Sequence, residues 1–146
     1  MARTSLYQNG GAFGFRDQLQ DAVNLLLLDS KPAREQIGRA CAHQFSAGDV
    51  CHWWHAGFGV EHGVRTRISD DLLWLPWAVC EYVEKTGDAE ILRAEYPFLA
   101  GEELEENEHD RYQPLEAVAE TGTVLEHCRR ALMRVLARGV GAHNGE

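Results

Sequence analysis

Apolar side chains recur at helical spacing in the first third of the chain. Over residues 15–28 this spacing places them on one broad face, which predicts an amphipathic helix. The residues on that face are Phe15, Leu19, Ala22, Val23, Leu26 and Leu27. A second helix is predicted over residues 32–45, since the proline at its start is tolerated in a first turn. Two helices joined by so short a turn predict an antiparallel helical hairpin.

The densest apolar run follows an acidic helix start. The hydroxyl of Ser69 can accept a hydrogen bond from a first-turn N–H, so this serine is a candidate N-cap. Asp70 and Asp71 would then lie in the first turn, where the helix dipole favours negative charge. From residue 72 onward the apolar positions are too dense for a surface helix. We therefore predict a mostly buried helix over residues 70–86, with its acidic end at an opening.

The remaining stretches have weaker patterns. Residues 89–99 predict a short helix interrupted by a proline, and residues 124–138 predict a last helix. Its expected inward positions are Leu125, Cys128, Leu132, Val135 and Leu136. Residues 46–68, rich in glycine, and residues 101–120, rich in acids, show no convincing alternation and predict long loops. The predicted fold class is therefore all-α.

Composition and charge exclude several classes of function. The 146 residues are enough for one domain. A net charge of −9 argues against binding to nucleic acid. The longest apolar run, residues 25–28, is too short to span a bilayer, and the N-terminus does not read as a signal peptide. Cys41, Cys51, Cys80 and Cys128 lack paired spacing, which favours reduced thiols. We therefore expect a cytoplasmic protein without a membrane segment.

Guanidinium groups, carboxylates and tryptophan rings gather near two predicted helix starts. Sugar rings stack on tryptophan, and sugar hydroxyls are held by side chains with paired donors or acceptors, as Arg and Asp supply. These residue types predict a carbohydrate-binding cleft, and the helix starts at Phe15 and Asp70 are predicted to open toward the same side. The candidate binding residues are Arg16, Asp17, Trp53, Trp54, Arg65, Arg67, Asp70 and Asp71.

Cleavage of a glycosidic bond also needs a general acid and often a second carboxylate. Asp17, Asp70 and Asp71 are the best-placed acids, but their spacing does not say which of them, if any, transfers a proton. Two other chemistries are less favoured. His52, His55 and His62 have a spacing that metal ligands can adopt, yet no Cys or carboxylate completes a usual set, so no metal is predicted. Ser69 lacks the strand–turn–helix context of a nucleophile, which favours capping over catalysis.

Four stretches add a resemblance to a known family. They lie in one colinear order within residues 8–137, and the motifs cover residues 10–21, 48–55, 65–76 and 123–128. Together they resemble glycoside hydrolase family 94, the inverting β-glucan phosphorylases. Within that family the resemblance is strongest to the phosphorylase-like C-terminal region of cyclic β-1,2-glucan synthases, followed by the cellobiose and chitobiose phosphorylases.

This resemblance implies an (α/α)6 barrel that cleaves a β-linked glucan or disaccharide to an α-sugar 1-phosphate. It implies no cofactor, with inorganic phosphate as co-substrate. Arg16 and Asp17 match the pair that holds the sugar in the donor subsite. The family's general acid lies in an Asp-Trp-Asn-Asp stretch shortly after the motif at residues 123–128, and its phosphate-binding segments come later still. Residues 1–146 contain neither. We therefore expect part of a catalytic barrel, truncated before the general acid, with no catalytic residue of its own and no turnover by itself.

A partial barrel would leave apolar helix faces uncovered, and large exposed apolar patches usually mark contact surfaces. We therefore expect a homodimer, or a complementing chain that supplies the rest of the barrel. The alternative is a non-catalytic carbohydrate-binding or structural helical module that acts with a partner chain.

Overall fold

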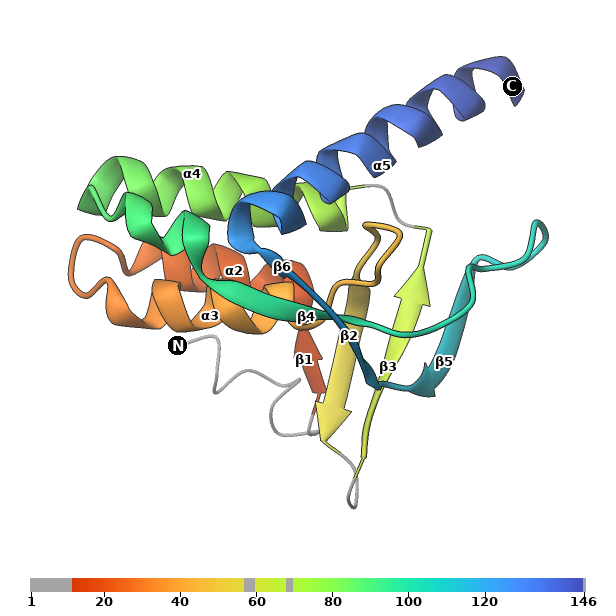
Figure 1. The fold of residues 1–146 in the computed structure, drawn as a ribbon, viewed down its shortest axis with the longest axis horizontal. Coiled ribbons are helices and arrows are strands. Elements are labelled where there is room, and N and C mark those ends of the chain that lie inside the picture. Colours follow the sequence, from red (N-terminus) through yellow and green to blue (C-terminus); the bar gives the residue numbers. More distant parts are fainter. Residues whose placement is uncertain (1–11, 57–59, 68–69, 146) are drawn as a thin grey trace.

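The computed structural model describes residues 12–56, 60–67 and 70–145. Three helices pack against one another at one end of the molecule, and a twisted antiparallel sheet stands at the other end (Figure 1). In chain order the elements are β1 (Ala12–Gly14), α2 (Phe15–Asn24), α3 (Lys31–Cys41), β2 (Cys51–Ala56), β3 (Glu61–Thr66), the 3-10 turn η2 (Asp71–Leu73), α4 (Trp74–Thr86), the 3-10 turn η3 (Ala89–Arg93), β4 (Glu95–Leu99), β5 (Asp110–Pro114), β6 (Ala117–Thr123) and α5 (Val124–Gly145).

The fold mixes helices with two antiparallel sheets, so the prediction of an all-α chain, and with it a piece of an (α/α)6 barrel, is wrong. The larger sheet has the order β1-β2-β3-β5, and the smaller pairs β4 with β6. The two stretches predicted as long loops supply most of these strands. Residues 46–68 were predicted as a loop because of their glycines. The aromatic and β-branched residues between these glycines are typical of strands, and two strands form there.

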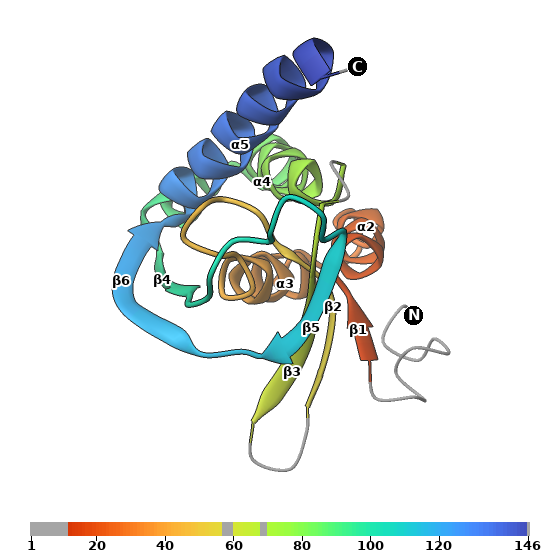
Figure 2. The same cartoon turned by 90° about the vertical axis from the view of Figure 1, so that its right-hand side faces the viewer.

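The strands in and after residues 101–120, a stretch predicted as a long loop, were missed for a different reason. β5 alternates between exposed and half-buried positions without a buried one, and the one buried residue of β6 is Gly122, so neither strand shows the alternation of buried apolar and exposed polar side chains. These strands are held by pairing with distant partners. β5 pairs with β3, and β6 pairs with β4. Figure 2 shows β6 and β4 curving around the end of α3. A predicted helix over residues 89–99 is accordingly replaced by η3 and β4.

The other predicted helices exist with changed boundaries. α2 ends at Asn24. Of the four leucines that follow it, Leu26 is buried in the core, whereas Leu27 is 86% and Leu28 84% exposed. The helix predicted over residues 70–86 is divided into η2 and α4. Pro76 is therefore the third residue of α4, in a first turn, where proline is tolerated better than in the interior of a helix. In α5, Leu125, Leu132 and Leu136 are exposed, so the inward face predicted for this helix is wrong at those positions.

The core lies between the helices and the inner face of the sheet. Its fully buried members include Phe15 of α2, Ile37 of α3 and Leu75 of α4. Of the four cysteines, which are free thiols, only Cys80 is exposed. No helix in the described part of the chain is long and apolar enough to cross a membrane.

A tight turn before β2 joins the core to α5. Gly48 has a φ of +103°, and a Cβ placed on it would lie 2.4 Å from the carbonyl oxygen of Arg130. The Gln44 amide donates to the carbonyl oxygens of Gly48 and His127, both at 2.9 Å. His127 is fully buried, and its ring contacts Gln44 Oε1 at 2.6 Å and the Tyr96 carbonyl oxygen at 2.9 Å. This network fixes the start of α5 against the turn.

Candidate functional site

The starts of α2 and η2 lie together, as predicted from their matching Arg and Asp side chains. Arg16 Nη1 is 3.3 Å from Asp70 Oδ2, and both side chains are about half exposed. Asp17 follows in the first turn of α2, with its carboxylate folded toward Gly14. The prediction that these two helix starts open toward the same side is therefore confirmed. The two segments are far apart in sequence, so this ion pair is a product of the fold.

A histidine from β2, His52, lies beside these side chains. We call the site formed by Arg16, Asp17, Asp70, Asp71 and His52 the mouth. The pairing of β2 with β3 shifts register between Cys51 and Trp53, which places an irregularity at His52. Such bulges redirect a side chain out of the regular strand alternation. His52 Nδ1 lies 2.6 Å from Oδ2 of Asp71, whose side chain is buried. The hydrogen bond to Asp71 raises the pKa of His52 above its ordinary value of 6.5, against the opposing effect of burial.

The His52–Asp71 contact makes a prediction about pH. The midpoint of the His52 ring titration is expected above 6.5 and should fall in the isosteric Asp71→Asn variant. Because the folded pKa is raised, the pair stabilises the fold fully below pH 6.5, and this contribution is lost as the pH rises through the folded value. NMR titration of the His52 ring measures the two midpoints, and urea unfolding at pH values on either side of 6.5 measures the change in stability.

Asp70→Asn serves as the matched control, because Asp70 pairs with Arg16 and not with the imidazole. It removes the same charge at the neighbouring position. An equal drop in the midpoint for both variants would contradict a specific His52–Asp71 hydrogen bond.

Beside this mouth lies a shallow groove of about 440 Å³ with two tryptophans in its wall. Trp74 and Trp77 meet edge to face with ring centroids 4.9 Å apart, and Trp77 is 37% exposed. The Arg16 guanidinium lies 6.0 Å from the centroid of Trp74. The groove is lined by Gln20, Asn24, Asp70, Leu73, Trp74 and Trp77. Exposed indole rings beside amide and carboxylate groups can both stack on a sugar and hold its hydroxyls.

The two tryptophans predicted from β2 lie elsewhere. Trp54 is 3% exposed and stacks on His43 with ring centroids 3.8 Å apart, so it is a core residue. Trp53 is half-buried, 5.9 Å from the rings of both His55 and Tyr112. These two rings therefore do not form one stacking surface with each other.

Arg65 and Arg67 were also predicted to bind sugar, but they are not part of the mouth. Arg65 is 1% exposed and holds Asp49 through two hydrogen bonds, Nε to Oδ2 at 2.6 Å and Nη2 to Oδ1 at 2.9 Å. Its Nη1 donates to the Glu102 carbonyl oxygen at 2.7 Å, and its guanidinium lies over the Phe45 ring at 4.1 Å. A guanidinium so enclosed organises the fold. Arg67 is exposed and lines a second pocket.

Of the eight predicted binding residues, the structure brings together Arg16, Asp17, Asp70 and Asp71. Ser69, the predicted N-cap, lies outside the described residues. The sequence analysis missed His52 as the partner of Asp71 and did not include Trp74 or Trp77 among the candidate binding residues. Spacing of tryptophans along a buried helix could not indicate that two of them reach its solvent face. In the described ranges, no three His, Cys, Asp or Glu side chains converge as a metal site would require.

Comparison with known proteins shows the family to which the chain belongs. Residues 1–145 match the family described as "Glycosyl hydrolase 94 superfamily, catalytic domain". The chain belongs to this family, and the family resemblance predicted from the four motifs is confirmed.

Two relatives give the match more detail. The chain is 50% identical over 132 residues to cyclic beta-(1,2)-glucan synthase NdvB of Rhizobium meliloti (strain 1021), covering 90% of this chain. It is 27% identical over 130 residues to N,N'-diacetylchitobiose phosphorylase of Vibrio proteolyticus, covering 72% of this chain. These matches span only 5% and 16% of the respective relatives.

Proposed function

We propose that this chain supplies a sugar-binding mouth to a family 94 catalytic domain that transfers a glycosyl group from a β-linked glucan to inorganic phosphate. In this proposal Arg16 and Asp17 hold the sugar in the donor subsite, Asp70 and Asp71 support them, and the product is an α-sugar 1-phosphate. The inverting course and the role of phosphate are carried over from the family resemblance.

The convergence of Arg16, Asp70 and the His52–Asp71 pair beside the Trp74 groove supports the proposal most directly. These groups come from α2, η2, β2 and α4, so the fold concentrates them at one place. Arg16 and Asp70 are about half exposed, which leaves their remaining hydrogen-bonding capacity to a ligand. The groove adds exposed indole surface for a second sugar ring.

The residues at this mouth are proposed to bind sugar rather than to donate the proton. The family resemblance assigns proton transfer to an Asp-Trp-Asn-Asp stretch that the 146 residues do not contain. We therefore expect the 146-residue chain to bind a β-glucan fragment without cleaving it.

Replacing Arg16 by Gln is expected to weaken binding of a β-1,2-linked glucose oligosaccharide about tenfold. A hydrogen bond to a charged group contributes about 1.5–3 kcal/mol, and every 1.4 kcal/mol corresponds to about a factor of ten in Kd. NMR titration measures the Kd, and the His52 ring signals report binding at this mouth.

Arg93→Gln is the matched control, because Arg93 is exposed on η3 and lines neither pocket. It removes the same charge and should bind like the unaltered chain. Absence of saturable oligosaccharide binding to the unaltered chain, or equal weakening in the two variants, would overturn the proposal.

A further inference from the structure

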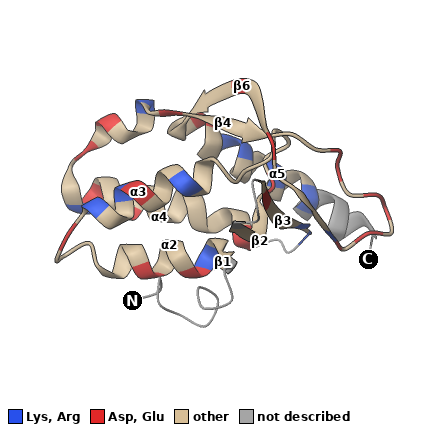
Figure 3. Ribbon diagram, turned by 90° about the horizontal axis from the view of Figure 1, so that it is seen from below, with Lys and Arg blue, Asp and Glu red and all other residues tan. Residues whose placement is uncertain are grey.

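His52 is the side chain of the mouth to which the proposed function gives no role of its own. Figure 3 shows an acidic and a basic position side by side where α2 begins, next to β1. His52 comes from β2, the strand that pairs with β1. Its side chain is 43% exposed, so a ligand held by Arg16 and Asp17 can reach the ring.

Asp71 is poorly placed to contact a sugar directly. Its side chain is only 2% exposed, and its Oδ2 lies 2.6 Å from Nδ1 of His52. A carboxylate on one ring nitrogen fixes the tautomer and the orientation of an imidazole. Asp71 therefore acts through His52 as a positioning residue, and the imidazole is the part of the pair that a ligand can touch.

The proton that His52 gains and loses is the one on Nε2. The Asp71 carboxylate accepts a hydrogen bond from Nδ1–H, so Nδ1 keeps its proton in both the charged and the neutral ring. Within the described residues Nε2 makes no hydrogen bond, and it carries a proton only in the imidazolium. This nitrogen therefore donates to a ligand below the midpoint of the ring titration and is an acceptor above it.

The charged groups that face His52 come from η2 and α2. The hydrogen bond to Asp71 raises the pKa of His52 most, and partial burial lowers it. The charges of Asp71 and of Asp17 raise this pKa further, whereas the charge of Arg16 lowers it. Arg16 itself pairs with Asp70. Together these groups keep the imidazolium up to a higher pH than the ordinary value of 6.5 would.

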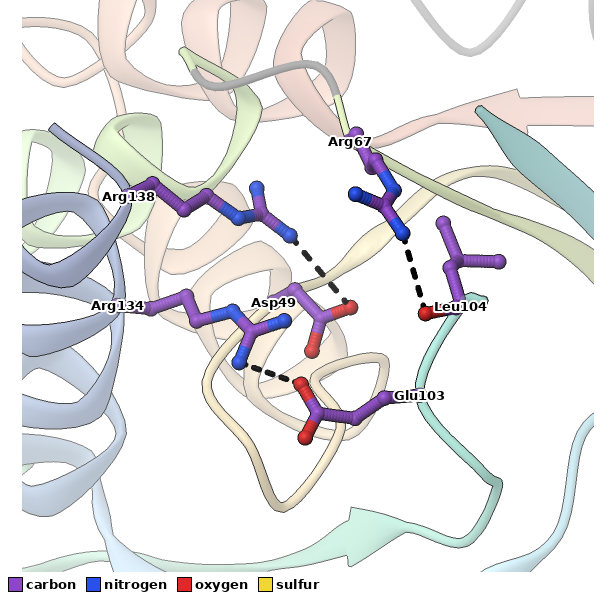
Figure 4. Close-up of a pocket in the computed structure, with 6 residues that line it drawn as sticks. All are labelled: Asp49, Arg67, Glu103, Leu104, Arg134 and Arg138. Carbon is purple, nitrogen blue, oxygen red and sulfur yellow. Dashed lines mark hydrogen bonds and ion pairs between the residues drawn. The ribbon is translucent and has the colours of Figure 1, made fainter. Parts of the chain in front are cut away.

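The second pocket, which Arg67 lines, contains no histidine among the described residues. Figure 4 shows Arg134 and Arg138 extending from α5 toward Asp49, with Arg67 reaching in from the opposite side. Histidine is the side chain whose ordinary pKa lies closest to neutrality. A change in sugar affinity near the His52 midpoint is therefore not expected from this pocket.

We propose that His52 contacts the sugar bound at the mouth through Nε2, with Asp71 as its positioning residue, and that sugar affinity falls as the pH rises through the titration of the ring. This role rests on the proposed function, because a sugar must occupy the mouth, and adds a ligand contact and a pH response to it. A sugar oxygen accepts a charge-assisted hydrogen bond from the imidazolium, which is about twice as strong as a neutral one. Loss of the charge is expected to raise the Kd about fivefold.

Isothermal titration of the 146-residue chain with a β-1,2-linked glucose oligosaccharide, at pH values on both sides of the His52 midpoint, tests the pH response. The Kd of the unaltered chain should rise about fivefold with pH. His52→Gln keeps a neutral donor, so its Kd should stay constant over the same range. A constant Kd in the unaltered chain, or an unchanged pH profile in His52→Gln, would overturn the proposal.

His109→Gln is the matched control for the loss of a histidine. His109 is exposed and lines neither the groove nor the second pocket. This variant should keep the full pH profile of the unaltered chain. A profile flattened equally in His109→Gln and His52→Gln would contradict a specific contact by His52.

The ring titration gives a second readout that needs no variant. Binding and protonation are coupled reciprocally, so a fivefold gain in affinity on protonation requires bound sugar to raise the His52 midpoint by about 0.7 pH unit. NMR titration of the ring with and without saturating oligosaccharide measures this shift. A midpoint that the sugar leaves unchanged or lowers would refute a hydrogen bond donated by Nε2.

Asp71→Asn separates positioning from a general structural role. The midpoint of the Kd profile should fall together with the midpoint of the ring titration, because both report the same proton. Weaker binding at every pH, with the midpoint of the Kd profile in place, would show that Asp71 does not act through His52.

These measurements also distinguish the role of His52 from the proposed function. Saturable oligosaccharide binding with a Kd independent of pH would remove the His52 contact and leave the sugar-binding mouth intact. No saturable binding at any pH would overturn both.

Discussion

Replacing Asp49 by alanine is expected to lower the free energy of unfolding by about 3–5 kcal/mol, because it leaves a buried charge without its partner. Arg65 is 1% exposed and directs two hydrogen bonds at Asp49, while its Nη1 donates to the Gly101 and Glu102 carbonyl oxygens. The Asp49 side chain is buried as well. Urea unfolding followed by circular dichroism measures the loss.

Two comparisons separate this effect from a general sensitivity to lost ion pairs. Lys85→Ala breaks a partly exposed pair with Glu81 on the surface of α4, and surface pairs contribute about 0–1 kcal/mol. The double variant Asp49→Leu with Arg65→Met replaces both charges by apolar groups and should recover much of the stability. An Asp49→Ala loss no larger than that of Lys85→Ala would show that Arg65 is accommodated without its carboxylate.

Gly48→Ala is expected to cost about 2–5 kcal/mol, because two penalties coincide at one residue. The φ of +103° is a conformation that L side chains rarely adopt. A Cβ at this position would also lie 2.4 Å from the Arg130 carbonyl oxygen, so the turn and α5 would have to separate. Thermal and urea unfolding of the variant measure the cost.

Gly87 offers a control for the second penalty. Its φ is +75°, but a Cβ there would meet nothing within 4 Å. Gly87→Ala should therefore cost only the conformational term, about 1–2 kcal/mol. Equal losses at the two glycines would show that α5 yields to the added methyl group and that their contact is not a fixed point of the fold.

The sequence predicted the helices better than the sheets for a physical reason. α2 and α3 bury one stripe of their surface, and that burial leaves a period of about 3.6 in the chain. β5 and β6 bury few side chains and depend on backbone pairing with strands far away in sequence. Backbone hydrogen bonds do not depend on a particular pattern of side chains, so the sequence pattern did not predict these two strands.

The candidate site shows the same limit at the level of single residues. Arg16 and Asp70 were found because each stands at a helix start beside aromatic residues. Arg65 and Arg67 are two residues apart, yet one is enclosed by Asp49 and the other lines a pocket. Strand alternation would place both on one face, and only the packing of the segment around residues 101–105 distinguishes their roles. The predicted dimer or complementing chain stays a prediction.

The larger sheet has two edge strands, β1 and β5, and the residues of these strands limit their pairing with strands of other molecules. β1 has only three residues. β5, at the other margin, pairs on one side with β3 and within the described residues has no strand on its outer side. Free margins of this kind invite the addition of strands from other molecules, and short length, charge and proline are the usual protections. Asp110, Arg111 and Pro114 supply charge and a missing N–H along β5. The protein therefore carries a built-in resistance to fibrous aggregation at the point where its sheet is most open.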